Sequence, residues 1–295
     1  MIEPSWYLLG LGLPMVIAAA LAWALVRNKD ARPGGLPAVG WSIGIGLAML
    51  IGLLATTGLP PWKSIQSQHW LVMAVLPAAL FVALIGSISK TPKAMLWLLR
   101  VLVAAGIAPV LMQPMVHYTW DAGEAVVWLG GLGAAVLTVW VLMHLYTVRY
   151  GGRAPLFVLG ATAAGVAVCT FASGSITSGQ LTGSFAVALG GVWLATASGK
   201  TCTHAGPGLT DIAVPLLLGL LINSWAYSWQ MQHEPLASRV VAGLLLAAPL
   251  GLWVGRVSLF KRLPSVNQAL VGCGVSALGI VSAIGIAGYE AYLRS

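Results

Sequence analysis

Three ionisable residues, His117, Asp121 and Glu124, stand at i, i+4 and i+7 between two apolar segments. If the helix formed by the second of these apolar segments begins before His117, this spacing puts all three side chains on one face of that helix. An imidazole with two carboxylates can bind a divalent cation or relay protons. The same pattern has a structural interpretation, because an acid followed three residues later by Glu is typical of a capped helix N-terminus. The spacing favours the cap, and the metal site is the alternative.

Arg100 and His144 lie inside apolar runs, where charge is expensive and is often functional. Arg100 is one to two turns from the end of its run, so its guanidinium could reach the lipid headgroups or contact an anion between helices. The sequence favours the headgroup interpretation and keeps Arg100 as a candidate substrate-binding residue. We expect His144 to pack between helices or at the interface, since a haem would normally need axial histidines from two helices.

The segment 170–184 is uncharged and rich in Ser, Thr and Gly. Irregular backbone at membrane depth is tolerated only where it is buried or lines a cavity, so an unwound helix here could offer carbonyls and hydroxyls to a solute. The favoured alternative is a plain loop whose hydroxyls bond to their own turns. Gln180, Thr182 and Ser184 of this segment, with Asn223 from a later run, are candidate substrate-binding residues.

Two apparent motifs lack the spacing that their chemistry requires. Residues 199–201 read Gly-Lys-Thr, as at the end of a phosphate-binding loop, but Leu194 stands where that loop needs glycine. Cys202, His204 and Asp211 lack the paired spacing of a zinc motif and are interpreted as loop residues. No Ser-His-Asp order or HExxH motif occurs at a believable spacing, which argues against a hydrolase.

The elements that position these residues follow from composition. Of 295 residues, 59% are hydrophobic and only 7% are charged, against about 25% charged in a soluble domain. A membrane helix needs about 20 apolar residues, and ten such runs joined by short connections predict an all-α, polytopic integral membrane protein. We expect one transmembrane domain over residues 1–295 and no soluble domain. The runs are residues 6–26, 38–58, 70–88, 94–112, 123–147, 154–174, 180–198, 209–228, 236–255 and 266–288.

Basic residues are distributed unequally between the two alternating sets of connections. One set and its flanks hold 12 of the 15 Lys and Arg residues, and the other set holds 3. Cytoplasmic loops retain basic residues, which predicts a multi-pass protein of the cell inner membrane with both termini on the outer, periplasmic side. The net charge of +8 is thus a topology signal, and no nucleic-acid partner is expected.

Residues 38–112 and 209–288 share a weak plan of apolar span, short basic loop and returning span, which suggests a duplication. Three functions fit the sequence. One is a carrier for a small neutral or weakly charged solute. The second is a non-catalytic subunit of a larger membrane complex. The third is an intramembrane enzyme that uses the histidines and acids expected on the outward face, among them His117, Asp121 and Glu124. The sequence leaves any cofactor open. Beyond the lipid bilayer, the expected partners are other membrane subunits or a second copy of the chain.

Overall fold

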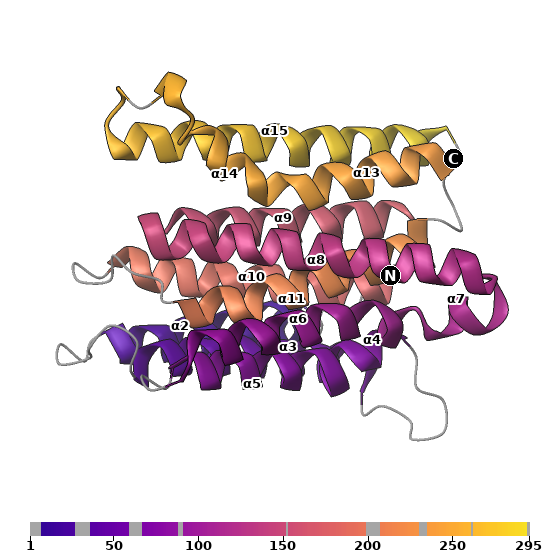
Figure 1. Ribbon diagram of the computed structural model, residues 1–295, viewed down its shortest axis with the longest axis horizontal. Helices are drawn as coiled ribbons and strands as arrows, with labels where there is room; N and C mark the ends of the chain where they lie inside the picture. The colour runs from indigo at the N-terminus through magenta and orange to yellow at the C-terminus, as the bar shows by residue number, and fades with distance from the viewer. Residues whose placement is uncertain are drawn as a thin grey trace.

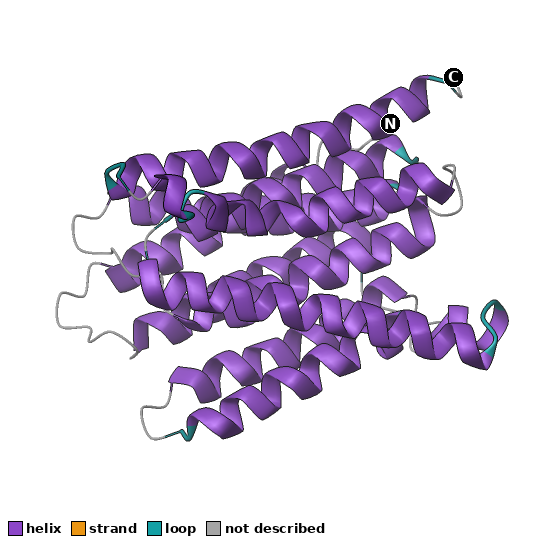
Figure 2. Ribbon diagram, turned by 45° about the horizontal axis from the view of Figure 1, so that its top comes forward, coloured by secondary structure: helices purple, strands orange, loops and turns teal. Residues whose placement is uncertain are grey.

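The computed structural model describes residues 7–26, 36–58, 67–87, 91–151, 153–198, 207–229, 235–260 and 262–293. Every regular element in these ranges is helical (Figure 2). The elements are η1 (Tyr7–Gly12), α2 (Leu13–Val26), α3 (Leu36–Thr57), α4 (Ser67–Trp70), η2 (Leu71–Val75), α5 (Leu76–Ser87), α6 (Lys93–Leu111), α7 (Gln113–Tyr118), α8 (Ala122–Tyr150), α9 (Ala154–Ala172), α10 (Ile176–Ser198), α11 (Pro207–Ser224), η3 (Trp225–Trp229), α13 (Pro235–Ala247), η4 (Ala248–Leu250), α14 (Gly251–Val254), η5 (Ser258–Phe260) and α15 (Ser265–Tyr292).

Helix occupies each of the ten predicted apolar runs, so the all-α, polytopic membrane architecture is confirmed. Within the described ranges, seven helical stretches are long and apolar enough to cross a membrane, and Gly10–Ala24 and Ser42–Thr56 are shorter apolar helices. The exact number of ten spans and the duplication of 38–112 and 209–288 stay predictions. The seven helical stretches that are long and apolar enough to cross a membrane are Ser67–Gly86, Lys93–Leu111, Ala122–Tyr150, Ala154–Ala172, Gly208–Tyr227, Ala237–Val254 and Ser265–Tyr292.

The helices lie side by side with their axes along one direction (Figure 1). In that view α13, α14 and α15 form one edge, α8 to α11 lie in the middle, and α2, α3, α5 and α6 lie on the other side. Helix α11 is the centre of the bundle, in contact with α3, α5, α6, α8 and α9. Residues 208–226 are all buried, as expected for a helix that is apolar around its whole circumference.

Local signals fix where the helices around the site begin and end. Asp121 caps α8, since its Oδ1 accepts a hydrogen bond from the backbone N–H of Glu124 at 2.8 Å. At the other end of α8, Gly151 takes a positive φ of 59°, which glycine adopts at low cost. Gly174 does the same after α9, with φ 81°. These signals give α8 and α9 defined ends, and α8 carries two of the site residues described below.

Small residues allow close helix contact at the edge of the bundle. A Cβ added to Gly251 on α14 would stand 2.6 Å from Oγ of Ser276 on α15, and one added to Gly272 would stand 2.8 Å from Cα of Leu252. The backbones of α14 and α15 therefore approach to a distance that larger side chains would prevent.

Candidate functional site: a buried ion pair joining three helices

Arg100 on α6 and Asp211 on α11 form an ion pair inside the bundle. Nε of Arg100 donates to Oδ1 of Asp211 at 3.0 Å, and Nη2 donates to Oδ2 at 3.0 Å. This is the two-pronged geometry that makes arginine–carboxylate pairs strong. Trp140 on α8 donates from Nε1 to the same Oδ1, also at 3.0 Å. Both charged side chains are 1% exposed, so one buried carboxylate joins three helices.

His144 and Trp97 complete the surroundings of the guanidinium. His144 lies one turn after Trp140 on the same face of α8, with Nδ1 at 3.1 Å from Nη2 of Arg100. A guanidinium offers only donors, so Nδ1 must accept, and the neutral ring then carries its proton on Nε2. Trp97 covers the guanidinium with Cζ 4.5 Å from its ring centroid, and meets the His144 ring edge-on at 5.5 Å. The Arg100 guanidinium thus contacts the Asp211 carboxylate, the Nδ1 lone pair of His144 and the ring face of Trp97.

The ion pair lies near one end of the bundle but inside the membrane-spanning helices. Asp211 is four residues after the start of α11, Arg100 is seven after the start of α6, and His144 is six before the end of α8. At 1.5 Å per residue these positions are about 6–11 Å from the helix ends. Helix α5 passes close by, since a Cβ added to its Gly86 would stand 3.4 Å from Oδ2 of Asp211. The pair is therefore enclosed by protein on several sides.

The structure corrects two interpretations of these charges. Arg100 does not extend to the headgroups, because it is 1% exposed and binds a carboxylate. Asp211 is not a loop residue, because α11 begins at Pro207 and buries it completely. Cys202 and His204 lie outside the described residues. The missed signal is simple: Arg100 and Asp211 are each the single charged residue of their apolar runs and have opposite signs. The packed histidine expected at His144 is confirmed.

The polar segment 170–184 is mostly helical. After the turn at 173–175, α10 starts at Ile176 and contains Gln180, Thr182 and Ser184, which are all buried. Thr182 donates its hydroxyl to the carbonyl of Ser178 at 2.8 Å. Ser184 donates to the carbonyl of Gln180 at 3.0 Å and also bonds the carbonyl of Gly10. The favoured expectation that hydroxyls bond their own turns is confirmed, although within a helix and not a loop.

Asn223 lies near the C-terminal end of α11, away from α10 in the sequence but also buried. Its Oδ1 has no hydrogen-bond partner in the described structure, and neither does Oγ of the adjacent Ser224. A buried polar atom without a partner costs free energy unless water or a ligand satisfies it. Of the four predicted polar residues, Asn223 therefore has the clearest capacity for a further hydrogen bond.

His117, Asp121 and Glu124 are not brought together on one helix. His117 belongs to α7, which ends at Tyr118, and α8 begins at Ala122 after a short turn. The early helix start that a shared face requires is absent, because Asp121 is occupied as the cap of α8. No group of three or more His, Cys, Asp or Glu within the described ranges could hold a metal ion. The described residues thus do not place these three side chains on one helical face, and a metal site that uses them stays a prediction.

No family model matches this chain, and no curated protein matches it significantly.

Proposed function

We propose that this multi-pass membrane protein is a carrier for a small, neutral or weakly charged solute. In this proposal the Arg100–Asp211 pair holds the bundle closed at the end where α8 terminates. The supporting observation is the fully buried pair with its three-helix connection. Charged residues inside membrane helices are rare and commonly mark solute or ion pathways.

The energetics of buried ion pairs support a functional role. Desolvation offsets most of the attraction in a buried pair, so well-packed apolar side chains often give equal or greater stability. A pair in such a position is better explained by a need for specific, breakable contacts between α6, α8 and α11. Carriers require contacts of this kind, because one group of helices moves against another around a solute site.

The charge balance of the site fits the proposed solute class. The charges of Arg100 and Asp211 compensate each other, and both side chains are fully partnered. The space between these helices therefore presents no uncompensated charge, which suits a neutral or weakly charged solute. We propose Asn223 as the first solute-binding residue to test, followed by Gln180, Thr182, Ser184 and Arg100. We also propose that the end near the ion pair faces the cytoplasm, since most basic residues flank that end.

A role as a subunit of a larger complex was favoured by the small number of charged residues inside the spans. A buried, fully partnered ion pair weakens that argument, and we therefore prefer the carrier. The enzyme hypothesis relied on the His and acid cluster at 117–124, whose acid Asp121 serves as a helix cap.

Accessibility of Thr147 tests the proposed closure. Thr147 is three residues after His144, 3% exposed, and donates only to the carbonyl of Met143 in its own helix. In a chain whose three cysteines are changed to Ala, Thr147→Cys should react with a membrane-impermeant maleimide in membrane vesicles. Thr196→Cys is the matched control. Thr196 is 1% exposed, lies at a similar depth near the same end, and bonds its own helix on α10.

Removal of both charges, Arg100→Gln with Asp211→Asn, should accelerate labelling at Thr147→Cys. An open state that is normally populated at about 0.1–10% would become more frequent, so an increase of about tenfold is expected. Thr196→Cys should change little. Equal labelling of the two positions, or no effect of the double substitution, would contradict a closure at the ion pair.

A further inference from the structure

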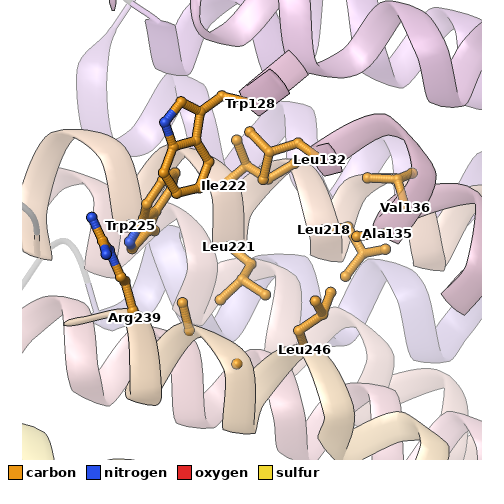
Figure 3. A pocket seen from close by; sticks show the side chains of 12 residues that line it. Trp128, Leu132, Ala135, Val136, Leu218, Leu221, Ile222, Trp225, Arg239 and Leu246 are labelled. Carbon is orange, nitrogen blue, oxygen red and sulfur yellow. The ribbon is translucent and has the colours of Figure 1, made fainter. Parts of the chain in front are cut away.

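A pocket of about 310 Å³ lies between α8, α11 and α13 (Figure 3). Most of its length is lined by aliphatic side chains, among them Leu132, Leu218 and Leu246. This volume is within the range of small-ligand sites. The pocket also contains free space at Gly243, because a Cβ added there would meet nothing within 4 Å.

One end of the pocket differs from the rest, since Trp128, Trp225 and Arg239 gather there (Figure 3). Trp225 is 5% exposed, yet its indole N–H has no hydrogen-bond partner among the residues that the structure describes. Arg239 is exposed, with Cζ 5.8 Å from the ring centroid of Trp128, which is itself 5.2 Å from the ring of Trp225. The charged Arg239 guanidinium and the neutral Trp225 indole N–H are therefore two donors that both lie beside Trp128.

The two ends of the pocket lie at different depths. Trp128 is six residues after the start of α8, Trp225 is four before the end of η3, and Arg239 is four after the start of α13. These positions are about 6–9 Å from the helix ends, the depth at which tryptophan and arginine meet lipid headgroups. Leu218 is two turns deeper along α11 than Trp225. The pocket is therefore cationic near the interface and apolar toward the membrane interior.

We infer that this pocket binds an anionic lipid of the surrounding bilayer. One acyl chain occupies the aliphatic part, and the phosphate accepts from the Arg239 guanidinium and the Trp225 N–H. Charge complementarity selects this occupant, because an uncharged chain would leave the buried N–H without an acceptor and the guanidinium without a counter-ion. The π-helical turn that starts at Trp225 places this side chain, and such turns are frequent at functional sites. The site does not depend on the proposed carrier activity.

Native mass spectrometry of the full chain in mild detergent tests the site, with phosphatidylglycerol and phosphatidylcholine of identical acyl chains as probes. The wild-type chain should bind phosphatidylglycerol more tightly. Arg239→Gln should lower that affinity about fivefold, to the level of phosphatidylcholine, and Arg239→Lys should retain most of the preference. Trp225→Phe, which keeps an aromatic ring and removes the N–H, should weaken the binding of both lipids, because each carries a phosphate that accepts from this N–H. Gly243→Phe should fill the pocket and reduce binding of both lipids.

Arg149→Gln is the matched control. Arg149 is also exposed and lies over an aromatic ring, with Cζ 5.6 Å from Tyr150, but at the opposite end of α8. Unchanged selectivity in Arg239→Gln would overturn the headgroup assignment. If thermal unfolding shows that Gly243→Phe is folded, and this variant still binds both lipids as the wild type does, the acyl-chain site is overturned. Displacement of the lipid by equimolar inorganic phosphate would show a free-anion site and overturn the assignment to a lipid.

Discussion

Removing one charge of the Arg100–Asp211 pair should destabilise the protein more than removing both. In Asp211→Asn the guanidinium stays buried among α6, α8 and α11 without its anion. In Arg100→Gln the carboxylate stays buried, keeps the Trp140 N–H as a donor and loses its cation. In the double variant neither charge remains.

The geometry sets the magnitudes. Both side chains are 1% exposed, so solvent cannot replace a lost partner, and breaking such a pair typically costs about 3–5 kcal/mol. The double variant loses the two bonds of the ion pair and the charge that strengthens the bonds to Trp140 and His144, but it leaves two neutral amides, and we expect a cost of about 1–2 kcal/mol. The two substitutions should therefore be strongly non-additive.

Equilibrium unfolding in mixed micelles, followed by helical circular dichroism, measures this cycle. The double variant should be more stable than either single variant, and Arg149→Gln at an exposed position should match the wild type. If the double variant loses the sum of the two single losses, or if Asp211→Asn leaves stability unchanged, the pair is not coupled as the structure indicates.

Three further outcomes are expected in the same unfolding assay. Trp140→Phe should cost about 2 kcal/mol, because it removes a hydrogen bond to a charged carboxylate, and a neutral result would contradict that bond. Asp121→Ala should cost about 1 kcal/mol through loss of the α8 cap, with metal content by elemental analysis unchanged; a fall in bound metal would revive the metal site. Gly251→Val should cost about 1–3 kcal/mol, because the added side chain pushes α14 away from Ser276. Gly243→Ala, where a Cβ would meet nothing, should be neutral or stabilising. Equal losses of stability in the two variants would argue against the close contact between α14 and α15.

The positions of the helices could be predicted from the sequence because the signal is strong and local. A run of apolar residues must satisfy its backbone within one segment at membrane depth, and only a helix does so. The predicted run 154–174 and the observed α9, Ala154–Ala172, agree closely for this reason. The Asp121 cap could also be predicted from the sequence, since it depends on two residues only three positions apart.

The ion pair could not be placed with the same certainty, because it depends on which helices are neighbours. Arg100 and Asp211 are 111 residues apart, and nothing local shows that α6 and α11 pack together. A charge near the end of an apolar run can extend to water or pair inside the bundle, and only tertiary packing distinguishes these outcomes. The Trp225 N–H, which lacks a hydrogen-bond partner in the described part of the chain, is likewise a result of packing, and the sequence does not predict it.

The most direct test of the carrier proposal is uptake into vesicles reconstituted with the purified chain. The vesicles would be incubated with a defined mixture of sugars, polyols and zwitterionic amino acids, and their contents analysed by mass spectrometry. We predict that at least one solute accumulates with the wild-type chain, and that the folded Arg100→Gln, Asp211→Asn double variant loses this accumulation. If vesicles with wild-type protein match protein-free vesicles for every solute, or if the double variant shows undiminished uptake, the protein is not the carrier proposed here.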